Sequence, residues 1–226
     1  MEVELLNHTP LWVASTAIRT CWDSGDKSDT GWFIPESEGD PDAYYVMGEK
    51  DLALIDRVGN KNKHSSTLEH ITYNFYVSGI SRAVLQELAR HRIASLSVKS
   101  TRYTLKELKN EEYMTEYMDK DAVEFASKYL VWTGNNHVDH FSYKALWHLQ
   151  AALKKGIAND KAKYCLPEAY KTELTWSINM RSLQNFLSLR TNKAALWEIR
   201  DLAHAVFEAL PEDHKYLLEG HVEDKI

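Results

Sequence analysis

Cysteine and long apolar runs are both scarce in this sequence. Its two cysteines, Cys21 and Cys165, stand far apart among 226 residues and form no C-x-x-C pair. A disulfide framework is therefore not expected, and a reducing compartment fits. The apolar runs are too short to span a bilayer, and residues 1–4 lack the positive charge that begins a signal peptide. The sequence predicts a cytoplasmic protein that does not associate with membranes.

Positive charge is also in deficit. The 27 Lys and Arg are outnumbered by 33 Asp and Glu, which gives a net charge of −6. A nucleic-acid track usually needs a basic face, so this balance favours a small anionic ligand in a pocket. No G-x-G-x-x-G is present, so a dinucleotide cannot be inferred from a Rossmann fingerprint. His137, His140 and His148 match no zinc spacing, so no metal site is predicted.

Hydrophobic periodicity predicts the secondary structure. The composition, 44% hydrophobic and 27% charged, is typical of one globular domain. Strict alternation predicts strands at 71–77 and 174–178, the first ended by Ser78-Gly79, and a short strand is expected at 3–6. Helices are expected at 11–22, 49–58, 81–94, 121–133, 139–156, 179–190 and 194–209.

Two segments carry few structural signals. Residues 23–42 are rich in Gly, Pro and acidic side chains without periodicity, which predicts a surface excursion. The wider stretch 23–48 is treated as a surface insertion without an assigned role. Cys165, beside Leu166-Pro167, is expected to be a small buried residue and not a nucleophile.

The densest polar run lies at residues 90–103. It contains four cations, one histidine and four aliphatic hydroxyls, namely Arg90, His91, Arg92, Ser95, Ser97, Lys99, Ser100, Thr101 and Arg102. Such donors suit oxyanions, because guanidinium forks match phosphate geometry and hydroxyls supply short directional bonds. The run is equally typical of a helix end that leads into a solvated basic loop. Composition alone leaves both interpretations open.

Two arginines also allow two interpretations each. Arg90 follows Glu87 by three residues, so the two could form a helix-stabilising pair, or Glu87 could hold the guanidinium for a ligand. Arg190 follows Leu183 by seven residues and Phe186 by four, so it extends an apolar stripe. There it either snorkels from the helix end or sits desolvated against an anion.

Four blocks of the sequence together resemble the flavin-dependent thymidylate synthases, the ThyX family. Arg90-His91-Arg92, Ser95 and Ser100-x-Arg102-Tyr103 resemble the motif that defines the family. Residues 64–70 resemble its H-x-[ST]-x-x-E-H block, and residues 179–190 its N-x-R-S-L-x-N-F-L-x-L-R block. Residues 19–21, Arg-Thr-Cys, match a weaker N-terminal pattern.

The resemblance implies a fold and an activity. The fold would be α+β, with a central, mostly antiparallel sheet flanked by helices, and residues 1–226 would form a single ThyX-like domain. The reaction would be reductive methylation of dUMP to dTMP, with 5,10-methylenetetrahydrofolate as carbon donor and NADPH as reductant through bound FAD. The enzyme would be a homotetramer with sites between subunits.

The resemblance also implies site residues. FAD would be bound by Ser66, Arg90, His91, Arg92, Asn179, Met180, Arg181 and Asn185. The nucleotide would be bound by Gln86, Glu87, Arg90, Lys99, Ser100, Thr101, Arg102, Lys163 and Arg190. Arg190 is the catalytic candidate, because a desolvated guanidinium stabilises the negative charge that builds on an activated uracil ring. The motif would place Arg90 to Arg92 at a helix end, and Ser100 and Arg102 on the extended segment that follows.

This sequence departs from the family pattern at three positions. Val98 stands where many relatives carry an acid or glutamine, so it receives no role. Lys163 stands where arginine is frequent, and lysine keeps the charge but loses the fork. Glu87 replaces a common glutamine and would need a cation beside it, which Arg90 can supply.

Two alternatives remain at this stage. A related flavin-dependent one-carbon transferase acting on a pyrimidine nucleotide would share every motif. A nucleic-acid-binding module using residues 90–102 would instead contain no flavin and bind with a steep salt dependence.

Overall fold

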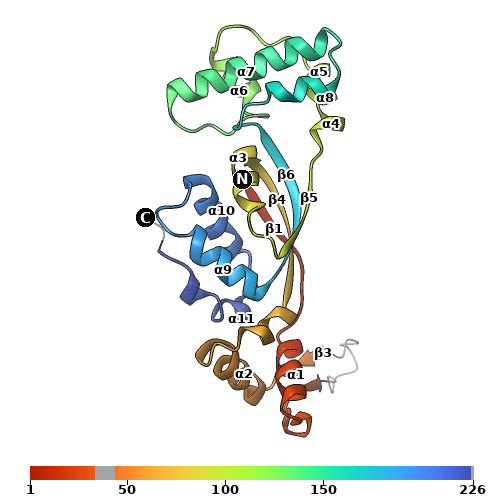
Figure 1. Ribbon diagram of the computed structural model, residues 1–226, viewed down its shortest axis with the longest axis vertical. Helices are drawn as coiled ribbons and strands as arrows, with labels where there is room; N and C mark the ends of the chain where they lie inside the picture. Colours follow the sequence, from red (N-terminus) through yellow and green to blue (C-terminus); the bar gives the residue numbers. More distant parts are fainter. Residues whose placement is uncertain (34–43, 225–226) are drawn as a thin grey trace, which may run out of the picture. The chain divides into compact units, whose positions relative to one another are not determined.

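The computed structural model describes residues 1–33 and 44–224. In this part of the chain, helices flank a four-stranded antiparallel sheet whose strand order is β1-β4-β6-β5 (Figure 1). The strands are β1 (Glu2–His8), β4 (Thr72–Ser81), β5 (Ala94–Val98) and β6 (Lys171–Asn179). The predicted α+β class is confirmed. No helix within the described ranges is long and apolar enough to cross a membrane.

The two alternating segments form the central strands of the sheet. Tyr73 and Phe75 of β4 are fully buried, as is Trp176 of β6, while Asn74 and Ser177 between them are half-buried. Ser177 Oγ donates a hydrogen bond to Asn74 Oδ1 at 2.6 Å across the two strands. The predictions at 71–77 and 174–178 are confirmed, because alternation places one side of each strand in the core.

β4 continues past Ser78-Gly79, so the predicted break is wrong. Gly79 has a φ of +70°, which glycine adopts without steric penalty, and the strand absorbs this residue without ending. A Cβ at this position would also lie 3.3 Å from the Met1 backbone. The chain then turns into α3 (Arg82–Leu88), where Ser81 Oγ accepts a hydrogen bond from Val84 N at 3.2 Å. Ser81 is therefore the N-cap of α3.

The chain divides into two compact units, and β4 and β6 contribute residues to both. The first unit contains Met1–Val3, Tyr76–Arg92 and Leu96–Trp176. The second contains Glu4–Phe75, Ile93–Ser95 and Ser177–Ile226.

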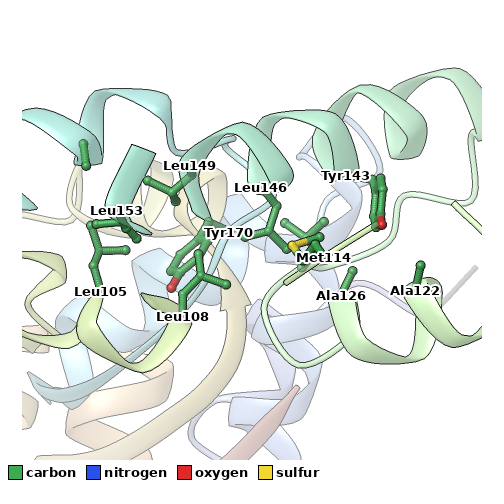
Figure 2. Packing of buried hydrophobic residues seen from close by; sticks show 12 residues of the cluster. Leu105, Leu108, Met114, Ala122, Ala126, Tyr143, Leu146, Leu149, Leu153 and Tyr170 are labelled. Carbon is green, nitrogen blue, oxygen red and sulfur yellow. The ribbon is translucent and has the colours of Figure 1, made fainter. Parts of the chain in front are cut away.

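The first unit is built around its longest helix, α7 (Asn136–Lys154). Around it lie α4 (Thr101–Thr104), α5 (Lys106–Asn110), α6 (Lys120–Ala126), α8 (Asn159–Ala162) and η4 (Lys163–Cys165). Leu146 and Leu149 of α7 are fully buried against Leu105, Leu108 and Tyr170 (Figure 2). This apolar cluster fixes the helices that carry several of the predicted site residues.

The second unit contains two groups of elements. One comprises α1 (Trp12–Cys21), η1 (Gly25–Lys27), β2 (Gly31–Phe33), β3 (Tyr44–Val46), α2 (Glu49–Ile55), the π-helical η2 (Asp56–Lys61) and η3 (Ser65–His70). The other comprises α9 (Met180–Arg190), α10 (Trp197–Glu208), α11 (Glu212–Lys215) and η5 (Glu219–His221). η3 and α10 both contact α9, which links the groups.

Three predicted segments are corrected. The helix expected at 81–94 ends at Leu88, and residues 94–98 form β5. Beyond Leu88 a helix would place polar side chains on its inner face, whereas the alternation of a strand half-buries Ala94 and Leu96. Arg102 lies in α4 and not on an extended segment. The helix expected at 121–133 ends at residue 126, since Leu130 bridges to Tyr170.

The acidic stretch after α1 contains regular structure that its composition does not predict. β2 pairs with β3 as an antiparallel ribbon, with Gly31 opposite Val46. The expected surface excursion over 23–42 thus includes regular structure at residues 31–33, and its residues 34–42 lie outside the described part of the chain. β-pairing here depends on a partner more than ten residues away, which local composition does not reveal.

A buried carboxylate holds this region to α1 and α2. Asp51 forms an ion pair with Arg19 and accepts hydrogen bonds from Ser28 Oγ at 2.6 Å and Thr30 Oγ1 at 2.7 Å. Burial alone would raise the pKa of Asp51, but the hydrogen bonds from Ser28, Thr30 and Arg19 and the charge of Arg19 together lower it. Arg19, noted in the sequence for a weak motif, thus has a structural partner.

Candidate active site

The predicted ligand-binding residues belong to both units. The first unit holds Gln86, Glu87, Arg90, His91, Arg92, Lys99, Ser100, Thr101, Arg102 and Lys163. The second holds Ser66, Asn179, Met180, Arg181, Asn185 and Arg190. The FAD set and the dUMP set each draw on both units.

In the second unit, the blocks at 64–70 and 179–190 pack against each other as η3 and α9. Asn179 caps α9, because its Oδ1 accepts a hydrogen bond from Ser182 N at 2.8 Å. Arg181 Nη1 donates to Glu69 Oε1 at 2.5 Å, which joins the two blocks. Ser66 lies exposed on η3. The structure therefore brings together two blocks that lie more than a hundred residues apart in sequence.

α9 has one exposed and one buried face. Arg181 and Asn185 are exposed, whereas Met180 is fully buried and its N–H donates to Ile71 O at 2.8 Å. Met180 thus differs from the rest of the predicted FAD set, since its side chain belongs to the core of this unit.

Arg190 is the last residue of α9. Leu183 and Phe186, which precede it on the same stripe, are fully buried, while Arg190 itself is half-buried. The predicted apolar stripe is confirmed. A half-buried guanidinium at the end of such a stripe is less screened by water than a fully exposed one.

In the first unit, α3 and the turn after it carry paired polar side chains. Gln86 Nε2 donates to Glu168 Oε2 at 2.8 Å. Arg90 Nη1 lies 3.4 Å from Glu87 Oε2, and 71% of the Arg90 side chain is exposed. Such an exposed pair contributes little to stability, so it restrains the guanidinium while leaving its other N–H groups available. Next to it, Arg92 is exposed.

The segment after β5 carries the predicted phosphate ligands. Ser100 and Arg102 are exposed and Thr101 is half-buried. The Arg102 guanidinium lies 5.3 Å from the ring centroid of Tyr103, and the Arg102 carbonyl accepts a hydrogen bond from Asn159 Nδ2 at 2.9 Å. Arg102 is therefore oriented by its own neighbours and retains an exposed fork.

Lys163 belongs to a segment beside the one that carries Arg102. Asn159, which bonds the Arg102 carbonyl, begins α8, and η4 with Lys163 follows directly. Lys163 is exposed. Two cations of the predicted dUMP set thus lie on adjacent segments of one unit.

Cys165 is exposed, so the prediction that it is buried is wrong. Cys165 is the last residue of the short η4 turn. The buried residues near this turn are Ala162, which precedes it, and Tyr170, which follows it. Within residues 1–33 and 44–224 there is no cluster of three or more His, Cys, Asp or Glu that could hold a metal ion.

The chain is similar to known proteins over almost its whole length. A family model described as thymidylate synthase complementing protein matches residues 4–214. A protein of Wolinella succinogenes named flavin-dependent thymidylate synthase is 60% identical over 217 residues, which cover 96% of this chain and 97% of the relative. One of the same name from Helicobacter pylori is 51% identical over 220 residues, 97% of this chain and 98% of that protein. The chain belongs to the flavin-dependent thymidylate synthase family.

Solved structures of this family agree with the fold described above. A crystal structure of thymidylate synthase X from Helicobacter pylori with FAD and dUMP has a TM-score of 0.87 and 50% identity. The match covers 99% of this chain and 100% of that chain. The family, the fold class and the enzymatic activity predicted from the motifs are confirmed, and the nucleic-acid-binding alternative loses its support.

The sequence did not reveal which carboxylates pair with the polar side chains of the predicted ligand sets in this flavin-dependent thymidylate synthase family member. Glu69, Glu168, Glu107 and Glu173 pair with Arg181, Gln86 or Lys99. Glu69 lies within a recognised block, which was a usable signal. The partnership of Glu173 depends on the pairing of β6 with β5, and β5 was not predicted.

Proposed function

We propose that this chain converts dUMP to dTMP by reductive methylation, with FAD bound and with 5,10-methylenetetrahydrofolate and NADPH as co-substrates. The observation that carries the proposal is the likeness, at 50% identity over nearly the whole chain, to a structure solved with FAD and dUMP. Bound flavin would supply the hydride transfer that no amino-acid side chain can perform. The protein would contribute binding, orientation and electrostatic stabilisation.

The proposed FAD ligands are the residues of the two contacting blocks and of the turn after α3. They are Ser66, Arg90, His91, Arg92, Asn179, Met180, Arg181 and Asn185. The donor set fits a dinucleotide, because Arg90, Arg92 and Arg181 offer exposed guanidinium groups that match pyrophosphate oxygens. Asn179 Oδ1 caps α9, which leaves its amide nitrogen as a donor. Met180, with a buried side chain, would support the site from the core.

The proposed dUMP ligands lie mainly in the first unit. They are Gln86, Glu87, Arg90, Lys99, Ser100, Thr101, Arg102, Lys163 and Arg190. Ser100, Thr101, Arg102 and Lys163 fit a monophosphate, because they combine hydroxyls with exposed cations on adjacent segments.

Arg190 is the proposed catalytic residue. Uracil C5 is a weak nucleophile, and its activation places negative charge on N3 and the neighbouring carbonyl. A guanidinium at the end of an apolar stripe stabilises this charge more strongly than one in water does. No cysteine nucleophile is part of this proposal.

The assembly and location are also proposed. Residues 1–226 would form one synthase domain, four copies would form a homotetramer with sites between subunits, and the enzyme would act in the cytoplasm without nucleic acid or membrane. The family model supports one domain, since its match at residues 4–214 runs through both units.

The test is anaerobic mixing of the purified protein with dUMP, methylenetetrahydrofolate and NADPH, followed by mass analysis of the nucleotide. The expected product is heavier than dUMP by one methylene unit, and the purified protein is expected to be yellow. A nucleotide bearing a different one-carbon group would favour the related transferase instead. Unchanged dUMP together with a flavin-free protein would contradict the proposal.

A further inference from the structure

Lys99 is held by carboxylates of its own chain. Its Nζ lies 3.5 Å from Glu107 Oε2 and 3.4 Å from Glu173 Oε1, and 32% of its side chain is exposed. The other oxygen of Glu173 accepts a hydrogen bond from Tyr76 at 3.1 Å. All four residues belong to the first unit. These two ion pairs hold the ammonium beside both carboxylates.

The Lys99–Glu107 ion pair joins the two ends of a short segment, residues 100–106. Lys99 directly follows β5, Glu107 lies in α5, and α4 with Arg102 lies between them. The Lys99 backbone N–H donates to Glu173 O at 2.9 Å, so the same residue is tied to β6 through its backbone and its side chain. Both ends of segment 100–106 are therefore fixed by one lysine.

The internal hydrogen bonds of this segment leave its side chains open. The Ser100 carbonyl accepts bonds from Tyr103 N and Thr104 N, both at 3.1 Å, and from Thr104 Oγ1 at 3.1 Å. The Ser100 backbone is extended, with φ −84° and ψ 110°. Ser100 is exposed and its side chain does not cap α4, so its hydroxyl remains available to a ligand.

We propose that Lys99 is a positioning residue for the nucleotide and does not touch its phosphate. Through Glu107 and Glu173 it holds Ser100, Thr101 and Arg102 in the conformation that binds the phosphate. This inference rests on the proposed function, and it changes the direct contact that the family resemblance implies for Lys99. Removal of the ammonium takes away the charge that pairs with both carboxylates, so the segment loses its side-chain ties to α5 and β6.

The variant Lys99→Met tests the proposal, because it keeps the length of the side chain and removes its charge. We expect the KM for dUMP to rise about tenfold while kcat stays within about threefold and flavin content is unchanged, as for lost ground-state binding. Lys99→Arg is expected to restore most of the affinity, since its cation still reaches both carboxylates. Glu107→Gln leaves Lys99 intact and is expected to raise the same KM about threefold.

Lys128 provides the matched control. Lys99 and Lys128 both line a cavity of about 270 Å³. Lys128 pairs instead with Glu111 at 3.6 Å, and 60% of its side chain is exposed. Lys128→Met is expected to leave the KM for dUMP unchanged. A similar rise in this control would show a general electrostatic effect and overturn the assignment to Lys99.

The outcomes separate this inference from the proposed function. Normal turnover by the wild-type enzyme with an unchanged KM in Lys99→Met would overturn the inference alone. A raised KM in Lys99→Met with unchanged values in Glu107→Gln and Glu173→Gln would indicate direct phosphate contact and also overturn it. Wild-type protein that neither binds nor converts dUMP would contradict the proposed function. If Lys99→Met loses its flavin, the KM of Glu107→Gln for dUMP is the test. A raised KM supports the inference, and an unchanged KM overturns it.

Discussion

Three cations of the predicted ligand sets, Arg90, Lys99 and Arg181, pair with carboxylates of their own unit. Arg90 pairs with Glu87 and Arg181 with Glu69, at exposed positions. Exposed pairs contribute about 0–1 kcal/mol to stability, so their main effect is on side-chain orientation. Arg190 is less exposed than Arg90 and Arg181, since it lies half-buried at the end of an apolar stripe. Two predictions concern single residues, Arg190 and Ser100.

Arg190→Ala is expected to bind FAD nearly normally and to lose turnover on the order of 10²–10³-fold, as for the removal of one preorganised electrostatic donor. Flavin absorbance of the purified protein and single-turnover conversion of dUMP measure the two effects. Arg200→Ala on α10, whose guanidinium bonds only the exposed Lys193 carbonyl among its described contacts, is the control. Retained turnover in Arg190→Ala would make Arg190 a snorkelling residue of the helix end.

Ser100→Ala is expected to weaken dUMP binding about five- to tenfold and to leave the flavin in place, because one charge-assisted hydrogen bond to phosphate is lost. The Ser100 carbonyl, which holds the segment, is unaffected by this change. Calorimetric titration of the holoenzyme with dUMP gives the affinity, and the visible spectrum gives the flavin content. Loss of colour would mean that Ser100 belongs to the flavin site.

At the scale of elements, buried polar contacts decide how segments without strong periodicity are placed. Asp51 joins α2 to Arg19 of α1 and to the segment that leads into β2. The side chains of Asp51 and Arg19 are 1% and 9% exposed, so neither charge is solvated if the other is removed. Removing one partner of such a buried pair lowers the free energy of unfolding far more than losing a surface pair does.

Asp51→Asn is therefore expected to lower the free energy of unfolding by about 3–5 kcal/mol, since it leaves the Arg19 guanidinium buried without a counter-charge. Asp56→Asn is the control, because Asp56 pairs with an exposed lysine, Lys61, at 2.6 Å. It is expected to cost less than about 1 kcal/mol. Denaturant unfolding of both variants provides the comparison, and equal losses would contradict the structural role of Asp51.

At the level of the whole chain, both proposed ligand sets include residues from each of the two compact units. Stability of the units therefore bears on activity as well as on folding. In the second unit, His214 is fully buried, bonds the Tyr73 hydroxyl through Nδ1 at 2.8 Å and meets the His8 ring edge-on at 5.0 Å. Burial lowers the pKa of His214 to about 4, with Asp213 opposing the shift and His8 adding to it.

This lowered pKa predicts that the protein loses stability on acidification at pH values above those at which most carboxylates become protonated. The unfolded chain takes up a proton near pH 6.5 and the folded chain near pH 4, so acidification between these values favours unfolding. The free energy of unfolding is expected to fall by on the order of 3 kcal/mol. The whole loss is present below the folded pKa, and no loss is expected above pH 6.5. Thermal midpoints measured from pH 7.5 to pH 4 test this.

His214→Gln removes the titrating group while keeping a polar side chain at the position. Its thermal midpoint is expected to be lower at pH 7.5 and to fall less between pH 6.5 and pH 4 than that of the wild type. His70→Gln, at an exposed position on η3, serves as the control and is expected to follow the wild-type profile. Parallel profiles for wild type and His214→Gln would contradict the assignment.

The central strands, most of the amphipathic helices and the family could be predicted from the residues alone. Alternation predicted β4 and β6 because one face of each is buried, and helical spacing predicted the stripe through Leu183 and Phe186 because those side chains form the core. The family blocks carry their functional residue types in fixed local order, so a linear reading finds them.

Which distant groups come into contact is visible only in the folded chain. The continuation of β4 through Gly79, the β5 strand, the pairing of Asp51 with Arg19 and the carboxylates around Lys99 all depend on partners from other elements. Local sequence cannot specify these contacts, because their energy arises from burial and from opposite charges brought together by folding. Lys99 reads as one more cation in a basic run until Glu107 and Glu173 are placed beside it.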